Sequence, residues 1–182
     1  MLGLLAAFGL AAATGLNAYL PLLIVGLLAR YTDLIALNAP WSALTHPMVL
    51  VIIAVMLLIE MTVDKIPAVD TVNDVIQTVF RPAAGAILFA ASSNVISNVS
   101  PVLAMVCGLL IAGGVHTAKA VARPAVTAGT LGTGNPVVSL AEDAVSGVTT
   151  VVAILAPVLL GLLFLLAVWL FIRRHQRRNS RA

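Results

Sequence analysis

Charged residues are scarce in this chain, and the scarcity bounds the class of protein. Of its 182 residues, 9% are charged and 61% are hydrophobic, whereas soluble domains average about 25% and about 45–50%. A chain of this length can bury only part of so much apolar surface in one core. The composition therefore excludes an ordinary water-soluble domain. It predicts an all-α, polytopic bundle of transmembrane helices surrounded by a lipid bilayer.

Cysteine and aromatic residues are also scarce. The single Cys107 excludes a disulfide framework, and its apolar surroundings suit a small core residue. Much of the positive charge lies in the tail 173–182, which has no tryptophan, tyrosine or phenylalanine to stack on bases. We therefore expect the tail to be a cytoplasmic anchor of a multi-pass inner (plasma) membrane protein, with no nucleic-acid partner.

Prolines and polar clusters divide a single membrane domain, 1–172, into about six candidate spans. A helix needs about 17–25 residues to cross a bilayer. Residues 67–80 carry polar side chains at helical spacing, and they predict an amphipathic or re-entrant half-helix between the second and third spans. The six candidates are 2–29, 47–63, 82–99, 101–122, 136–155 and 157–172.

The positions of the basic residues favour six spans with both termini in the cytoplasm. This topology places every lysine and arginine except Arg30 on the cytoplasmic side, as the positive-inside rule requires. In a five-span alternative, 144–171 would form one kinked span. The basic residues between the second and fifth spans would then lie outside.

Two pairs of segments resemble each other, in the same order within the halves 1–99 and 100–172. Halves with three spans each would enter the membrane in opposite directions, as in the 3+3 inverted repeats of many secondary transporters. The alternative is that glycine-rich helix faces pack together, within the chain or between copies in a homo-oligomer. The similar pairs are 9–17 with 108–116 and 82–89 with 157–164.

Acidic residues at membrane depth form the first cluster of candidate site residues. One helical face carries Glu60 and Asp64, and a second carries Asp70, Asp74, Gln77 and Arg81. Because stacked carboxylates repel one another, this pattern favours a bound proton or cation. The alternative is an interfacial loop whose acids cap helices and pair with Lys65 and Arg81.

Two further clusters lie in the second half of the chain. The basic one consists of His116, Lys119 and Arg123 on one helical face. This face could bind an anion, neutralise the acids, or snorkel at a helix end. The acidic pair Glu142 and Asp143 follows a glycine-rich loop, where it could also simply complement a helix dipole. Asn17 follows a glycine by two residues, as His116 does, and is a further candidate ligand.

Acids outnumber bases in these clusters, and the surplus indicates the kind of ligand. Six acids minus four bases leaves two negative charges when His116 is neutral. A surplus of carboxylates favours a cation or protons over an anion. Oxygen ligands suit hard metals such as magnesium or manganese, and we expect Glu60, Asp64 and Asp74 to bind one if it is present. No organic cofactor is predicted.

The order of these motifs resembles domain-of-unknown-function family 4126, a group of small bacterial membrane proteins. The resemblance covers nearly the whole chain and implies a polytopic helical fold without an established activity. The motifs are Gly15-Leu-Asn17-Ala-Tyr-Leu-Pro21, Glu60-x-x-x-Asp64-Lys65-Ile-Pro67-x-x-Asp70, Asp74-x-x-Gln77-Thr78-x-x-Arg81-Pro82-x-x-Gly85 and the Glu142-Asp143 pair.

Together these features predict a small secondary transporter or exchanger. It would move a cation, with divalent metals among the candidates, coupled to protons through intramembrane carboxylates. The alternative is a membrane scaffold or assembly subunit whose charges only pair helices. An enzyme is not expected, because no segment supplying a nucleophile or acid follows Lys119 and Arg123.

Overall fold

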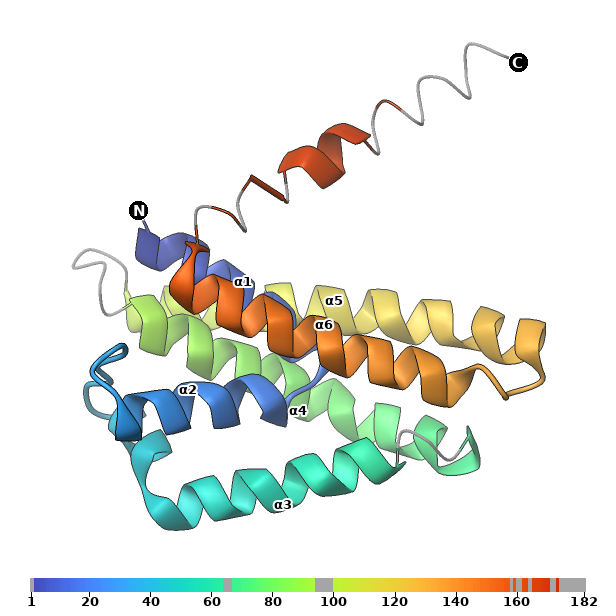
Figure 1. Cartoon of the computed structure of the whole chain (residues 1–182), viewed down its shortest axis with the longest axis horizontal. Coiled ribbons are helices and arrows are strands. Elements are labelled where there is room, and N and C mark those ends of the chain that lie inside the picture. Colours follow the sequence, from blue (N-terminus) through green and yellow to red (C-terminus); the bar gives the residue numbers. More distant parts are fainter. Residues whose placement is uncertain are drawn as a thin grey trace.

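The computed structural model describes residues 2–63, 67–93 and 100–157, and beyond these 159, 162–163, 165–170 and 173. These residues form six α-helices and one short 3-10 helix and include no strand, which confirms the all-α class. Figure 1 shows α4, α5 and α6 extended along the long axis of the molecule, with α3 along one edge. The elements are α1 (Leu2–Leu16), α2 (Tyr19–Tyr31), η1 (Trp41–Thr45), α3 (Pro47–Val63), α4 (Pro67–Ser93), α5 (Pro101–Thr130) and α6 (Asn135–Leu155).

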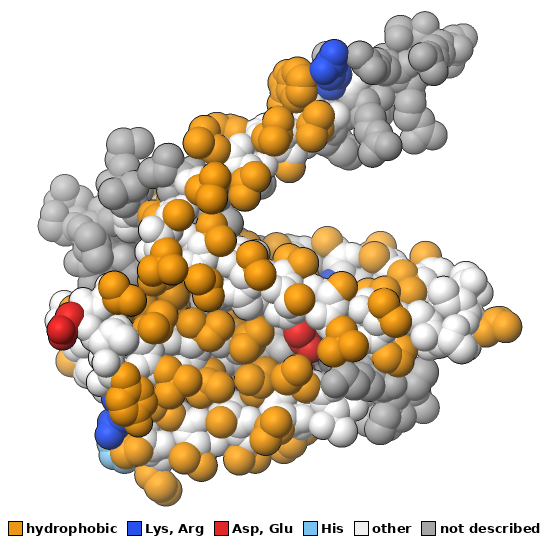
Figure 2. Space-filling model, in the orientation of Figure 1, with side chains coloured by type: hydrophobic (Ala, Val, Ile, Leu, Met, Phe, Trp, Pro, Cys, Tyr) orange, Lys and Arg blue, Asp and Glu red, His pale blue; other side chains and the backbone are white. Residues whose placement is uncertain are grey.

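Among the described residues, three helical segments are long and apolar enough to cross a membrane: Val75–Ser92 within α4, and the whole of α5 and α6. Their outward positions carry large apolar side chains, among them Val102, Leu110 and Val148. Figure 2 shows hydrophobic side chains covering the flank over α2, α3 and α6. Such a surface is stable in lipid and would be unfavourable in water. The structure therefore supports the predicted membrane-helix character.

The predicted first span, 2–29, is wrong as a continuous helix. The chain forms α1 and α2, and Figure 1 shows α2 returning toward the end of the molecule at which α1 begins. The two helices have 15 and 13 residues, or about 22 Å and about 20 Å. Neither is long enough alone for a hydrocarbon core of about 30 Å. We call this pair the α1–α2 hairpin; its tip is Leu16–Ala18, where Asn17 and Ala18 are buried.

The predicted half-helix 67–80 and residues 82–93 of the predicted third span belong to one helix, so the separation between them is wrong. Residues 94–99 of that span lie outside the described residues. Helix α4 continues from Pro67 to Ser93 with Pro82 in its interior. A proline removes one helical hydrogen bond, but α4 packs closely on α1 and α5, and α5 contacts it on both sides of Pro82, at Thr78 and at Gly85. The segment that folds back on itself is instead the α1–α2 hairpin.

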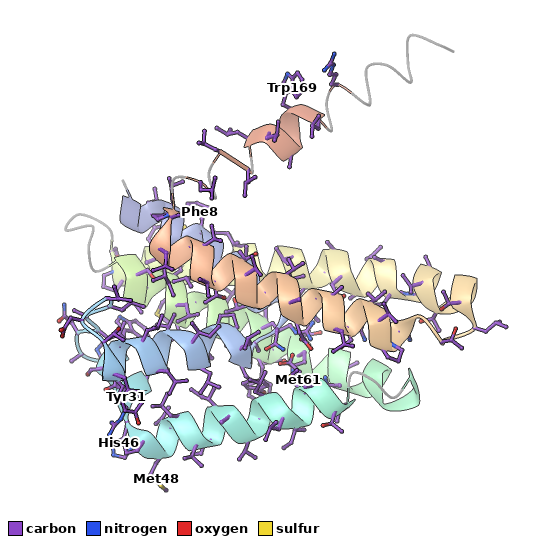
Figure 3. All side chains as sticks on the ribbon, viewed as in Figure 1. Phe8, Tyr31, His46, Met48, Met61 and Trp169 are labelled. Carbon is purple, nitrogen blue, oxygen red and sulfur yellow. The ribbon has the colours of Figure 1, made fainter. Side chains whose placement is uncertain are left out.

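The second half of the bundle follows the sequence more closely. Helix α5 extends past the predicted end at residue 122, and α6 agrees with the predicted span 136–155. Leu131 and Gly132, with φ of 50° and 82°, turn the chain between them. Helix α6 ends at Leu155, just before Pro157, the position at which the five-span alternative places its kink within 144–171. The described residues of the predicted span 157–172 are largely helical, and Trp169 lies apart from the packed helices (Figure 3).

Glycines allow α1, α4 and α5 to approach one another closely. A Cβ atom added to Gly108 would collide with the carbonyl of Gly85 in α4 and lie 2.6 Å from Phe89 Cβ. A Cβ atom on Gly15 would lie 2.6 Å from the carbonyl oxygen of Ala112 in α5. Gly15 and Gly108, one from each of the segments 9–17 and 108–116, therefore serve in helix packing, which is the role that the alternative to a repeat gives them. The contact holds the hairpin tip against α4 and α5.

Two glycines of α5 provide a test of this packing. Gly108→Ala should lower the free energy of unfolding by about 1–3 kcal/mol, because the new methyl group overlaps the backbone of α4. Gly114→Ala is the matched control in the same helix, since no atom lies within 4 Å of the added Cβ. It should leave stability unchanged or raise it by up to about 1 kcal/mol through helix propensity. Melting temperatures in one detergent compare the two, and equal values would contradict the close approach.

Candidate functional site: a buried charge network at a helix break

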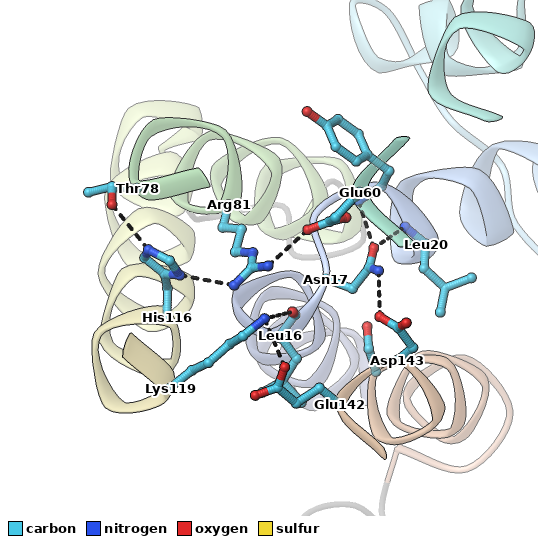
Figure 4. A network of polar contacts seen from close by, with 12 residues as sticks. Leu16, Asn17, Leu20, Glu60, Thr78, Arg81, His116, Lys119, Glu142 and Asp143 are labelled. Carbon is cyan, nitrogen blue, oxygen red and sulfur yellow. Dashed lines mark hydrogen bonds and ion pairs between the residues drawn. The ribbon is translucent and has the colours of Figure 1, made fainter. Parts of the chain in front are cut away.

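Charged and polar side chains gather around the tip of the α1–α2 hairpin. Figure 4 shows them extending from α3, α4, α5 and α6 toward the connection between α1 and α2. All are buried except Glu142, which is partly exposed. We call this set the buried charge network; it consists of Asn17, Glu60, Arg81, His116, Lys119, Arg123, Glu142 and Asp143.

Arg81 is the link between α3, α4 and α5. Its Nη2 donates to Glu60 Oε1 at 2.9 Å, and both side chains are at most 1% exposed. Its Nη1 lies 3.1 Å from His116 Nδ1. Because a guanidinium only donates hydrogen bonds, His116 Nδ1 must accept, so the imidazole is neutral and carries its proton on Nε2. That proton is donated to Thr78 Oγ1, 3.1 Å away.

Lys119 and Arg123 bind the same carboxylate oxygen. Glu142 Oε2 lies 2.9 Å from Lys119 Nζ and 2.9 Å from Arg123 Nη2. Lys119 Nζ also donates to the carbonyl oxygen of Leu16 at 3.3 Å. That carbonyl ends α1, where the helix dipole favours a positive charge. Lys119 therefore ties α5 both to the hairpin tip and to α6.

Asn17 occupies the break between α1 and α2 and forms hydrogen bonds with both α2 and α6. Its Oδ1 accepts from the backbone N–H groups of Tyr19 at 3.1 Å and Leu20 at 2.9 Å, as a helix cap does. Its Nδ2 donates to Asp143 Oδ1 at 2.8 Å. One turn of α6 further on, Ser146 Oγ donates to the Ala13 carbonyl at 2.9 Å. Polar groups released by the helix break are thus satisfied inside the protein.

The network joins residues from all three predicted clusters. Arg81 meets His116, and Glu142 meets both bases of the second cluster. The predicted ligand Gln77 is buried one turn before Arg81 on α4, and its Oε1 has no hydrogen-bond partner in the described part of the chain. The prediction that these clusters bind an ion stays a prediction.

Four predicted site residues cannot be placed in the network. Asp64 and Lys65 lie outside the described residues, and Asp70 and Asp74 belong to α4 with only their backbone described. The predicted metal set of Glu60, Asp64 and Asp74 includes two of these four. Within the described side chains, no group of three metal-ligating residues occurs.

The described network is balanced in charge. Three acids, Glu60, Glu142 and Asp143, face the three bases Arg81, Lys119 and Arg123, and three minus three is zero. Burial of ionised groups is tolerated when they are paired and hydrogen-bonded, because each partner compensates the lost hydration of the other. The surplus of two negative charges expected from the sequence therefore comes from the four residues that the network does not include.

Sequence reasoning missed two contributors to the site. The Leu16 carbonyl is a backbone group, and only the position of the helix break could have indicated it. Asn17 followed by Pro21 is a recognised helix-start signal that marks this break. Thr78, the partner of His116, gave no signal of its own because threonine is common on apolar helices.

Long apolar helices around an internal polar site define a helical membrane protein. The chain belongs to the family described as Domain of unknown function (DUF4126), whose model matches residues 4–177. The matched region includes every residue of the buried charge network. No curated protein and no solved structure matches the chain.

A charge swap tests the bond between α6 and the hairpin tip. Asn17→Asp would place a carboxylate against Asp143 and should cost about 1–3 kcal/mol of stability, because the donor is lost and like charges meet. The double variant Asn17→Asp, Asp143→Asn restores one donor and one acceptor and should recover most of that loss. A double-mutant cycle on melting temperatures measures the coupling. Additive effects would show that the two side chains do not interact.

Proposed function

We propose that this protein is a small secondary transporter or exchanger that moves a cation coupled to protons through carboxylates of the buried charge network. The observation that carries the proposal is the break at Leu16–Ala18 beside buried ionised side chains. In secondary transporters, discontinuous helices supply backbone carbonyls and helix ends to substrate and coupling ions. Ionisable groups at membrane depth are costly and generally mark such pathways.

Contacts between the two halves of the chain support this location. Arg81 meets His116, Asn17 meets Asp143, and the Leu16 carbonyl meets Lys119, each across the boundary at residues 99 and 100. Transporter sites lie where structural halves meet. The described helices of the second half are continuous, so the support comes from this interface and not from a strict 3+3 repeat.

Glu142 is the carboxylate best placed for exchange. A carboxylate can take up a proton or bind a cation, and this competition couples the two. Glu142 is 15% exposed and binds two bases, whereas Glu60 is 1% exposed and balances the fully buried Arg81. Removing the charge of Glu60 would break a fully buried ion pair with Arg81, a loss that costs about 3–5 kcal/mol in other buried pairs. We therefore assign Glu60 a mainly structural role and Glu142 the ion-binding role.

The reversal in the α1–α2 hairpin changes the expected position of the amino terminus. We propose that α3 to α6 and segment 157–172 each cross the membrane, while the hairpin enters from outside and returns. Arg30 then stays outside, and the α3–α4 and α5–α6 connections and the basic tail lie in the cytoplasm, as the positive-inside rule requires. This topology has five crossings, because the hairpin replaces the first of the six spans. It leaves every later connection on the same side as before and places the amino terminus outside.

Site-directed labelling tests the topology in a Cys107→Ser background. An impermeant maleimide should label Asp33→Cys in intact cells and Thr133→Cys only after permeabilisation, because these exposed residues lie in opposite connections. An epitope tag ahead of Met1 should be accessible from outside. A tag that is protected while Asp33→Cys is labelled would restore the six-span topology.

A membrane scaffold is the second candidate, and a specific observation favours it. The pairing of Glu60 with Arg81, and of Glu142 with Lys119 and Arg123, could serve only to hold helices together. In that case the protein would not dissipate an ion gradient across the membrane. Association of copies through small-residue faces, as expected of a scaffold, has open surface available at Gly114 and Gly129 of α5.

Reconstituted vesicles with an internal pH dye separate the two candidates. An inward gradient of a mono- or divalent cation should raise the internal pH in wild-type vesicles, because protons leave as the cation enters. Glu142→Gln should reduce the signal to that of protein-free vesicles, while Asp33→Asn, an exposed acid outside the network, should keep the wild-type rate. If no such gradient changes the pH in wild-type vesicles, the scaffold is the better account.

A further inference from the structure

The ammonium group of Lys119 lies between two oxygen atoms that would suit a metal cation. One is the carbonyl oxygen of Leu16, which ends α1 at the break, and the other is Glu142 Oε2. The carbonyl carries the negative end of a helix dipole and the carboxylate a full charge. Helix-end carbonyls with carboxylates are the donor set that transporters use for sodium and that hard cations prefer.

Because Arg123 binds the same carboxylate, the ammonium group of Lys119 can be replaced by another cation. Its Nη2 lies 2.9 Å from the same Glu142 oxygen, so the carboxylate keeps one positive partner when Lys119 moves away. A guanidinium always remains charged, whereas an ammonium is a compact point charge on a flexible stem. The side chain that can withdraw is therefore Lys119.

A buried hydroxyl on the same side of α6 as Glu142 supplies an independent sign of a ligand. Ser139 Oγ is fully buried and has no hydrogen-bond partner among the residues that the structure describes. Ser139 precedes Glu142 by three residues on α6, so the two share one side of the helix. A buried polar group of this kind generally marks a site for water, an ion or another ligand.

We propose that the Leu16 carbonyl and Glu142 Oε2 form the binding site of a monovalent alkali cation, and that the Lys119 ammonium takes the place of this cation when it is absent. The ammonium and potassium ions are similar in size and equal in charge. Exchange of one for the other therefore keeps a single positive charge at these two oxygen atoms, whereas a divalent ion would place two charges there. Only the meaning of this site for transport rests on the proposed function.

Substitutions at Lys119 test the site by binding alone. In detergent, Lys119→Gln should show a saturable rise in melting temperature of several degrees in potassium chloride relative to choline chloride at equal ionic strength. Wild-type protein should need at least about tenfold more potassium, because its ammonium competes. Lys119→Arg should not respond, since a permanent cation then fills the site. Lys119→Gln combined with Glu142→Gln should lose the response.

The outcomes decide between the proposal and a purely structural lysine. Arg30→Gln removes an exposed basic side chain that donates to the Thr45 carbonyl, outside the network, and should not gain a potassium response. Equal melting curves of Lys119→Gln in potassium and choline, or a response to magnesium but not to potassium, would overturn the proposal. If Lys119→Gln aggregates in choline, potassium should restore a monodisperse protein. Aggregation in both salts, repeated with Lys119→Ala, would also contradict the proposal.

Binding and transport can fail separately. Potassium binding by Lys119→Gln without any cation flux in wild-type vesicles would keep the site and reject the transporter. Flux in wild-type vesicles without potassium binding by Lys119→Gln would keep the transporter and reject this site.

Discussion

Backbone groups that leave a helix inside an apolar bundle must find hydrogen bonds within the protein, because lipid supplies none. The connection between α1 and α2 meets this demand through Asn17, Lys119 and Ser146. Lys119 and Ser146 lie more than one hundred residues from the groups they bind. This demand for hydrogen bonds explains why α5 and α6 lie beside the hairpin tip, because Lys119 belongs to α5 and Ser146 to α6.

The same side chains explain how charge is kept at this depth. Arg81 and Glu60 neutralise each other under full burial, and a neutral His116 orients Arg81 without adding charge. Glu142 differs, because it is partly exposed and shared by two bases. The network thus combines a fully buried ion pair with a partly exposed carboxylate that is shared by two bases.

Features that depend on one helix or on bulk composition could be predicted from the sequence. The apolar composition indicated lipid, and the span 136–155 agrees closely with α6 (Asn135–Leu155). Features that depend on packing were misplaced. Pro82 suggested a helix end, yet one missing hydrogen bond in α4 is offset by contacts with α1 and α5. The actual break, at Asn17, follows no proline and relies on a capping side chain.

By itself, the sequence determined the class of protein, its lipid surroundings and the residue types of the site. These follow from composition and from spacings of three and four residues along single helices. Only the tertiary structure decided that α1 and α2 fold back, that Lys119 meets the Leu16 carbonyl, and that Glu142 serves two bases. The physical reason is that a buried charge or an open backbone group is stabilised by partners on other helices. Spacing within one helix does not identify those partners.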